Sequence, residues 1–218
     1  MNNFPPWRRE LPLLAGLSAG FLALLVIVLN GAPTGADRWL GSQIQSIPWG
    51  AFSFIPRLGS DLGGGVYGFY VIPTLVGAVL AVKREWKLLV LLAGVFVLHF
   101  VLISPKLFIV AYRPSPAFGV QGAGGLESFP SGHVEWAASF YGFLAYVSSS
   151  RFPRFRPLIL TAFAVVVLAT MLGRIELGRH WPVDTLAGLL IGLIAVRSLV
   201  LAHHFLGVQS APIAATTV

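Results

Sequence analysis

The stretch LPLLAGLSAGFLALLVIVLN, from Leu11 to Asn30, sets the fold class because its twenty residues include no charged side chain. A helix of this length rises about 30 Å at 1.5 Å per residue, which matches the hydrocarbon core of a bilayer. Arg8 and Arg9 stand just before it, and the next charge is Asp37. The run exceeds the roughly 7–15 apolar residues of a signal peptide, so we interpret it as a retained membrane anchor.

Five more apolar stretches follow, each about as long as a membrane span. The sequence therefore predicts an all-α polytopic membrane protein with six transmembrane helices, forming a single domain over residues 1–218. The tail 209–218 is small and polar and is predicted to be frayed. The six predicted spans are Leu11–Asn30, Gly65–Val82, Leu88–Ser104, Val134–Ser150, Pro157–Gly173 and Thr185–Phe205.

The composition agrees with a membrane protein. Only 11% of the 218 residues are charged and 56% are hydrophobic, whereas about 25% of an average soluble domain is charged. The net charge of +7 does not indicate nucleic-acid binding, because the basic residues are scattered between the apolar runs. The chain lacks cysteine, which excludes thiolate chemistry and cysteine-based zinc sites. The five histidines lack HExxH spacing, so we expect no metal and no other cofactor.

The basic residues predict the orientation. Short cytoplasmic loops are enriched in Lys and Arg, and one set of predicted helix ends carries a cluster of these residues. This side, with the N-terminus, is predicted to be cytoplasmic, and the other side periplasmic or extracellular. The small size and short loops favour a bacterial inner membrane. The clustered residues are Arg8, Arg9, Lys83, Arg84, Lys87, Arg151, Arg154 and Arg156.

The first polar group on the predicted outer side is KLFIVAYRP, from Lys106 to Pro114. Lys106 and Arg113 are seven residues apart, which is two turns of a helix. If the third span continues this far, both cations lie on one face of it. Pro114 is then expected to end the helix.

The second group is PSGH, directly before the fourth predicted span. Ser131 is a good N-cap residue, and Gly132 allows a ligand to approach the backbone closely. The N-terminus of a helix presents free N–H groups and a positive dipole end, which suits an anion. His133 follows immediately.

The third group lies in GRIELGRHWPVD, between the fifth and sixth predicted spans. Pro182 suits the first turn of the sixth helix, which places Asp184 in that turn and within reach of His180. The 41 residues from His133 to Arg174 are enough for two short spans and a turn, so the second and third groups return to the same side.

Together the three groups provide three cations, two histidines and a carboxylate, which is a set suited to phosphoryl transfer. Fixed cations and helix N–H groups stabilise the oxygens of a transferring phosphoryl group. A histidine oriented by a carboxylate can act as nucleophile, and a second histidine can protonate the leaving oxygen.

The pattern resembles the type 2 phosphatidic acid phosphatase superfamily, which includes lipid phosphate phosphatases and vanadium haloperoxidases. Its signature is K-x6-RP, then PSGH, then SR-x5-H-x3-D. The resemblance covers residues 105–184, and it departs from the family at Gly173, where a serine is usual. The matching residues are Lys106, Arg113, Pro114, Pro130, Ser131, Gly132, His133, Arg174, His180 and Asp184.

The resemblance implies a role for each matched residue. His180 is implied as the nucleophile that forms a phosphohistidine, Asp184 as its orienting carboxylate, and His133 as the general acid. It also implies a metal-independent enzyme with six helices. The implied phosphate-binding residues are Lys106, Arg113, Ser131, Gly132 and Arg174.

The resemblance further implies an integral membrane lipid phosphatase acting on phosphomonoester or diphosphate lipids in the bilayer. Phosphatidic acid, phosphatidylglycerol phosphate and undecaprenyl diphosphate are the candidate substrates. Two alternatives are a lipid phosphotransferase that uses the same phosphohistidine and a non-catalytic lipid-binding or transport protein.

Four polar residues near the three groups have less certain roles in the sequence. Arg179 is a possible contact for a lipid headgroup or diphosphate. His99 is predicted to be a packed, hydrogen-bonded residue of the third span, and Glu127 and Glu135 are predicted to be solvated edge residues. The segment 37–47 is either an amphipathic helix on the membrane surface or a helix that packs over the spans.

Overall fold

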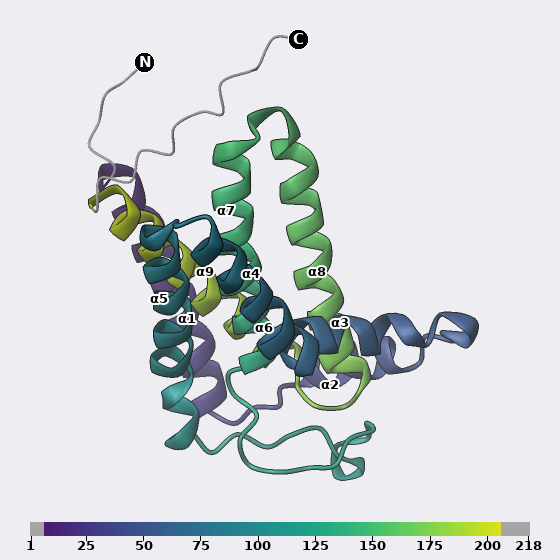
Figure 1. Cartoon of the computed structure of the whole chain (residues 1–218). Coiled ribbons are helices and arrows are strands. Elements are labelled where there is room, and N and C mark those ends of the chain that lie inside the picture. Colours follow the sequence, from purple (N-terminus) through teal and green to yellow (C-terminus); the bar gives the residue numbers. More distant parts are fainter. Residues whose placement is uncertain (1–6, 206–218) are drawn as a thin grey trace.

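The computed structural model describes residues 7–205, in which helices and connecting loops occur but no β-strand (Figure 1). The predicted frayed tail, 209–218, lies outside the described residues. Two short π-helical segments occur, Val66–Val71 and Ala137–Tyr141. The second joins α6 to α7 without a break, whereas Gly65, with an extended backbone, separates the first from α3. The α-helices are α1 (Trp7–Leu29), α2 (Gly35–Gln45), α3 (Phe54–Gly64), α4 (Ile72–Val82), α5 (Trp86–Ile103), α6 (Gly132–Trp136), α7 (Gly142–Arg151), α8 (Arg156–Glu176) and α9 (Pro182–Phe205).

Five helical stretches among the described residues are long and apolar enough to cross a membrane, so the predicted count of six spans is not confirmed. The stretch that does not qualify contains the predicted span 134–150. It is helical, as α6, a π segment and α7, but it includes three serines and Arg151 near its end. The second stretch begins fifteen residues earlier than predicted. The five are Glu10–Leu29, Gly50–Val82, Trp86–Leu107, Pro153–Glu176 and Pro182–Phe205.

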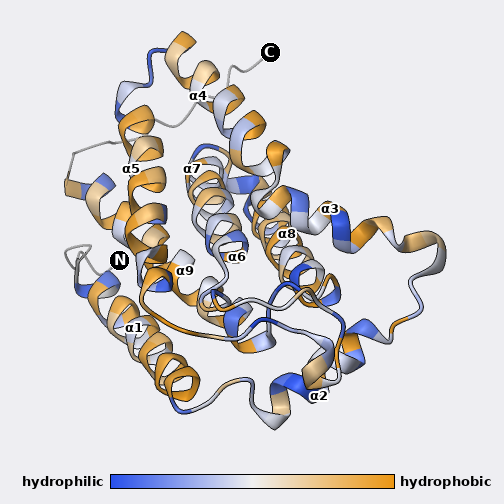
Figure 2. Cartoon of the chain, turned by 90° about the horizontal axis from the view of Figure 1, so that it is seen from below, coloured by the Kyte–Doolittle hydropathy of each residue, from blue (hydrophilic) through white to orange (hydrophobic). Residues whose placement is uncertain are grey.

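The helices form a bundle around α9, which is the most buried of the five candidate spans. Its neighbours include α1, α5 and α6. Large hydrophobic side chains point outward as well as inward: Leu22, Val97 and Leu158 are each more than half exposed. Hydrophobic residues dominate α1, α5 and α8, whereas hydrophilic ones gather in α2 and the loops (Figure 2). An apolar outer surface of this kind is suited to lipid.

Glycines bring α9 and α6 into close contact. A Cβ atom on Gly188 would lie 2.5 Å from the Ser131 carbonyl oxygen, and one on Gly192 would lie 2.5 Å from the Ala138 Cβ. Small residues at a helix interface let two backbones approach in this way. The helix that follows PSGH is therefore packed directly against the helix that carries Asp184.

Glycines also allow close packing between α3 and α8. A Cβ on Gly59 would lie 2.3 Å from the Ala169 carbonyl oxygen, and one on Gly63 would lie 2.1 Å from the Thr170 Cγ2. Thr170 also donates a hydrogen bond of 2.9 Å to the Gly59 carbonyl. In Figure 1, α3 lies across the end of α8 that is farther from the α7–α8 turn.

Each π-helical segment contacts a neighbouring α-helix, the first contacting α6 and the second α3. The indole N–H of Trp136 donates a 2.8 Å hydrogen bond to the Gly68 carbonyl, and the Phe69 ring lies 4.5 Å from the Trp136 ring, centroid to centroid. The Tyr141 hydroxyl donates to the Leu62 carbonyl at 3.0 Å. Such segments occur often at functional sites, and these two bring aromatic rings next to α6.

Helix α2 packs against the loop that precedes α9. The Asp37 carboxylate accepts a hydrogen bond from the Val183 N–H at 3.0 Å, which satisfies one of the free N–H groups at the start of α9. Gln45 donates to the carbonyls of Gln121 and Ile175. Of the two interpretations of segment 37–47, packing is therefore observed, although Trp39 remains 64% exposed.

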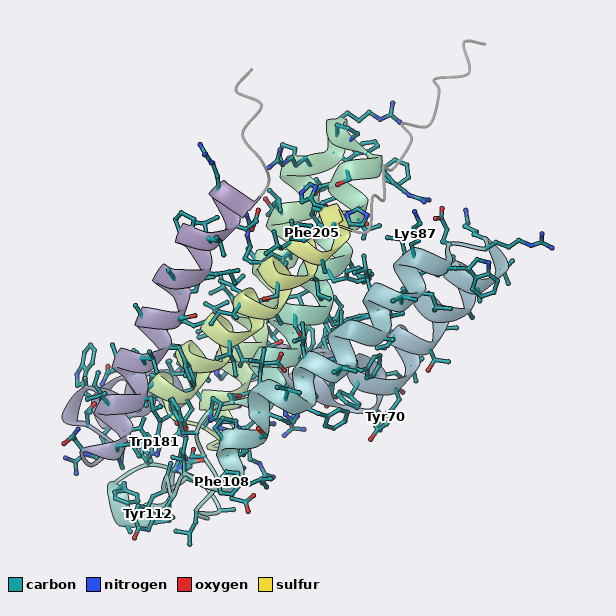
Figure 3. The ribbon with its side chains drawn as sticks, turned by 90° about the vertical axis from the view of Figure 1, so that its left-hand side faces the viewer. Tyr70, Lys87, Phe108, Tyr112, Trp181 and Phe205 are labelled. Carbon is teal, nitrogen blue, oxygen red and sulfur yellow. The ribbon has the colours of Figure 1, made fainter. Side chains whose placement is uncertain are left out.

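The two ends of the bundle differ in what they carry. Lys87 and Phe205 lie at one end, and Phe108, Tyr112 and Trp181 lie at the other (Figure 3). The long loop between α5 and α6, which contains the first predicted polar group, lies at this second end (Figure 1). The three polar groups therefore meet far from Lys87.

Candidate active site

The first polar group is not helical, which corrects the prediction for Lys106 to Pro114. Helix α5 ends at Ile103, a 3-10 turn follows over Ser104–Leu107, and the chain is then extended. The Ala111 N–H donates to the Leu126 carbonyl at 2.9 Å, and the Ala111 carbonyl accepts from the Ser128 N–H at 3.0 Å. Backbone pairing with the segment before PSGH replaces the helical hydrogen bonds.

The two cations of this group nevertheless converge, because each reaches a neighbouring motif. Lys106 Nζ donates to the Pro130 carbonyl at 3.1 Å. Arg113 donates to the Glu127 carbonyl at 2.9 Å and to the Arg179 carbonyl at 2.8 Å. Arg113 thus ties all three polar groups together.

The PSGH segment lies at the start of α6, as predicted, with Ser131 at the N-cap position. The Ser131 side chain makes no capping hydrogen bond. Its hydroxyl is buried and has no partner in the described structure, whereas its N–H donates to the Asp184 carbonyl at 3.0 Å. A buried hydroxyl without a partner is costly unless a ligand satisfies it, so Ser131 is well suited to bind an anion.

His180 and Asp184 face each other, with 3.6 Å between Nδ1 and the carboxylate oxygen Oδ2. Asp184 is held by hydrogen bonds from the Ser128 hydroxyl and from the Trp181 N–H, the latter at 2.8 Å. Both residues are almost fully buried. Since Nδ1 faces the carboxylate, Nε2 is the nitrogen left for a substrate.

Burial lowers the pKa of His180 well below its ordinary value of 6.5, and the charges of Lys106, Arg174 and Arg113 lower it further. Both effects disfavour the protonated imidazole. A neutral imidazole has the free lone pair that a nucleophile needs. The cations therefore have two effects at once, because they can attract an anion and keep His180 unprotonated.

A cavity of about 470 Å³ connects these groups. Ser131, Arg179 and Asp184 do not line it. Ser131 and Asp184 are buried, and the exposed Arg179 accepts a hydrogen bond from Arg113 through its carbonyl. Aromatic side chains line the cavity as well. The predicted site residues that line it are Lys106, Arg113, Gly132, His133, Arg174 and His180, and the aromatic residues are Phe69, Tyr70, Phe100 and Trp136.

His99 also lines the cavity, and it is hydrogen-bonded through Nδ1 to the carboxylate of Glu135. The prediction of a packed, hydrogen-bonded His99 is confirmed. The prediction of a solvated Glu135 is wrong, because Glu135 is fully buried. Within residues 7–205, this site included, no three His, Asp or Glu side chains are arranged to hold a metal ion.

Comparison with known proteins identifies the family of the chain. Residues 84–207, more than half of the chain, match the model of the PAP2 superfamily. The chain belongs to the PAP2 superfamily. No curated protein matches the sequence.

Two solved structures of PAP2-type phosphatases share the fold. The first transmembrane PAP2 type phosphatidylglycerolphosphate phosphatase from Bacillus subtilis has a TM-score of 0.72 and 21% sequence identity, over 90% of this chain and 98% of that one. LpxE from Aquifex aeolicus has a TM-score of 0.61 and 22% identity, over 77% of this chain and 96% of that one. At these identities the likeness concerns the fold.

The departure from the PAP2 pattern at Gly173 has a structural reason. A Cβ on Gly173 would lie 2.1 Å from the Pro56 carbonyl oxygen of α3, so no serine fits there without moving a backbone. Ser60, one turn further along α3, accepts a 3.0 Å hydrogen bond from Arg174 Nη1. The Ser60 hydroxyl of α3 thus contacts Arg174, the residue that follows Gly173.

Sequence reasoning missed Ser60 and Ser128 as members of this PAP2 site. Ser60 lies in a stretch assigned to a loop, although the glycines in GSDLGGG recur at the four-residue spacing that favours close helix packing. Ser128 directly precedes FPSGH, and nothing in its local sequence indicates a partner 56 residues away.

Proposed function

We propose that this PAP2 protein is an integral membrane lipid phosphatase that acts on phosphomonoester or diphosphate lipids through a phosphohistidine on His180. One observation carries the proposal: His180, whose Nδ1 lies 3.6 Å from an Asp184 carboxylate oxygen, lines a single cavity with His133 and three cations. The chemical demands of phosphoryl transfer are positioning and electrostatic stabilisation, and this cavity offers both.

In the first step, the Nε2 lone pair of His180 forms a bond to phosphorus while the bond from phosphorus to the leaving oxygen breaks. His133 gives its proton to that oxygen, so the product leaves as a neutral alcohol or as a lipid phosphate. Lys106, Arg113 and Arg174 would stabilise the equatorial oxygens, and the free hydroxyl of Ser131 would add a hydrogen bond.

In the second step, a water molecule gives a proton to His133 and attacks phosphorus as the bond to His180 breaks. Free phosphate is released and both histidines return to their starting states. Asp184 balances the charge that His180 carries while it is bonded to phosphorus.

The aromatic side of the cavity supports a lipid as substrate. Tyr70 and Phe100 line the cavity and are also 63% and 60% exposed, so this wall continues to the outer surface of the bundle. A phosphate at the cations would thus leave its apolar chain beside aromatic rings. The similarity in fold to the phosphatidylglycerolphosphate phosphatase also supports a lipid phosphate as substrate.

We include Gly132–Arg151 as a sixth span, since its helical segments are continuous and long enough for the hydrocarbon core. With six spans, the basic loops lie on the cytoplasmic side and the cavity opens at the outer face. Because the chain contains no cysteine, single cysteines at Ser115 and at Arg154 can be labelled with an impermeant maleimide on intact cells. Labelling at Ser115 only is expected, and the reverse pattern contradicts the orientation.

The test of the activity is phosphate release from a panel of lipid phosphates and diphosphates in detergent, with EDTA present. We expect wild type to release phosphate and His180→Ala to release none, while His203→Ala, at the other end of α9, stays active. Equal activity of wild type and His180→Ala would contradict the mechanism. A phosphorylated lipid acceptor without free phosphate would indicate a phosphotransferase.

A further inference from the structure

The buried pair formed by His99 and Glu135 has no part in the steps above, although it borders the same cavity. Glu135 is fully buried and His99 is 6% exposed. A buried ionisable pair in a membrane protein is costly and marks a functional position more often than a structural one. Three aromatic rings surround His99, with centroids 5.2–5.3 Å away: Phe69, Phe100 and Trp136.

The orientation of the ring determines what the pair can bind. Nδ1 is occupied by Glu135, so the opposite edge, which carries Nε2, is the edge left for the cavity that His99 lines. The atom Cε1, next to Nε2, is 4.0 Å from the position that a Cβ would take on Gly132. His99 therefore stands beside the residue that precedes His133.

We propose that His99, oriented by Glu135, forms a leaving-group subsite that binds a second phosphate next to the scissile oxygen of a lipid diphosphate. Because this subsite presupposes the phosphatase chemistry, it rests on the proposed function. With the terminal phosphate at His180 and the three cations, the other phosphate would lie toward His133 and His99, where His99 is the polar group among the aromatic rings.

The electrostatics of the pair suit this ligand. With both ring nitrogens protonated, Nε2–H donates to a phosphate oxygen and Nδ1–H donates to Glu135, so the imidazolium lies between two anions. The carboxylate keeps the empty subsite neutral, which limits the cost of an ionised histidine among aromatic rings. A monophosphate lipid places only its ester oxygen and apolar chain here, so it has no second phosphate to accept the hydrogen bond from His99 Nε2–H.

The test compares two lipids that share one chain, farnesyl diphosphate and farnesyl monophosphate, in the same detergent. The variant is His99→Leu with Glu135→Leu, because removing both members leaves no unpaired buried charge. The matched control is Tyr146→Phe with His203→Leu. It removes another hydrogen-bonded histidine, because the Tyr146 hydroxyl and His203 Nδ1 are 2.8 Å apart at the other end of α9. The quantity measured is the ratio of kcat/KM for the diphosphate to kcat/KM for the monophosphate.

This ratio does not depend on the fraction of enzyme that is folded, and monophosphate turnover reports folding directly. We expect the ratio of kcat/KM values to fall at least about tenfold in the His99 and Glu135 variant, which is the loss typical of one hydrogen bond to a charged group. The ratio should stay unchanged in the control. If wild type is active and the ratio of the His99 and Glu135 variant lies within twofold of the wild-type ratio, the subsite proposal is overturned and the phosphatase proposal is not. Wild type that releases no phosphate from either lipid overturns the phosphatase function as well.

Discussion

Ser60 Oγ accepts a hydrogen bond from Arg174 Nη1 at 3.0 Å across the contact between α3 and α8. The two residues are 114 positions apart in the chain, and Ser60 is buried. The Nε of Arg174 has no partner in the described structure. Ser60 therefore holds one edge of the guanidinium and leaves the rest for phosphate.

The first prediction concerns this hydrogen bond. Replacing Ser60 with Ala should lower kcat/KM for lipid phosphate hydrolysis about tenfold, because a lost hydrogen bond to a charged group costs roughly 1.5–3 kcal/mol when it is buried. Ser139→Ala is the matched control, since Ser139 is buried but donates to the Trp136 carbonyl. Equal kinetics for the two variants would show that Ser60 does not position Arg174.

The second prediction is that restoring the family serine harms this protein. In Gly173→Ser, the new Cβ would lie 2.1 Å from the Pro56 carbonyl, so α3 must move away from α8. Overpacking of this kind costs about 1–3 kcal/mol, and a displaced α3 also withdraws Ser60. We expect a lower Tm in detergent and lower activity, whereas higher activity at an unchanged Tm would contradict the steric explanation.

The third prediction concerns pH. The pKa of His180 lies well below 6.5 through burial and three neighbouring cations, so the nucleophile stays unprotonated as the pH falls past 6.5. The acid limb of kcat/KM should therefore lie below that value. Lys106→Met removes one repelling charge, which raises the pKa of His180 and moves the acid limb to higher pH.

Lys87→Met provides the control for this shift, because Lys87 lies at the opposite end of the bundle (Figure 3). The substrate phosphate also titrates, but it does so equally in all three enzymes. An acid limb that stays in place in Lys106→Met would mean that His180 is not the group observed.

The fourth prediction concerns stability. Asp37 accepts hydrogen bonds from Thr34 and from the Val183 N–H at the start of α9. In Asp37→Ala, this buried N–H loses its partner, which should cost about 1–3 kcal/mol and lower the Tm. Asp61→Ala, at an exposed position, should leave the Tm unchanged. Similar losses in both variants would contradict a specific role for Asp37.

The sequence predicted that His133, His180 and the three cations form one group, because their motifs depend on local spacing. The turn from Arg174 to Asp184 and the start of α6 at Ser131 are set by neighbours within a few residues, such as Pro182 and Gly132. The all-helical class followed from long apolar runs, for which hydropathy is a sufficient signal.

Predictions failed where distant backbone contacts determine the structure. Lys106 to Pro114 has a helical spacing of cations, yet pairing of Ala111 with Leu126 and Ser128 makes it extended. Glu135 looks like a solvated carboxylate until its partner, 36 residues earlier, is known. The span count also remains a prediction at 134–150, where Glu135 and four serines lower the hydropathy.

The fit of Gly173 against Pro56 has a consequence for descent. An ancestor with the usual serine at 173 could not have held α3 as close to α8, so the hydroxyl at 60 would have been out of reach of Arg174. We therefore expect gain of the glycine and recruitment of Ser60 to be coupled events. Among relatives of this chain, a glycine before the third-motif arginine should be inherited together with a hydroxyl residue at the position of Ser60.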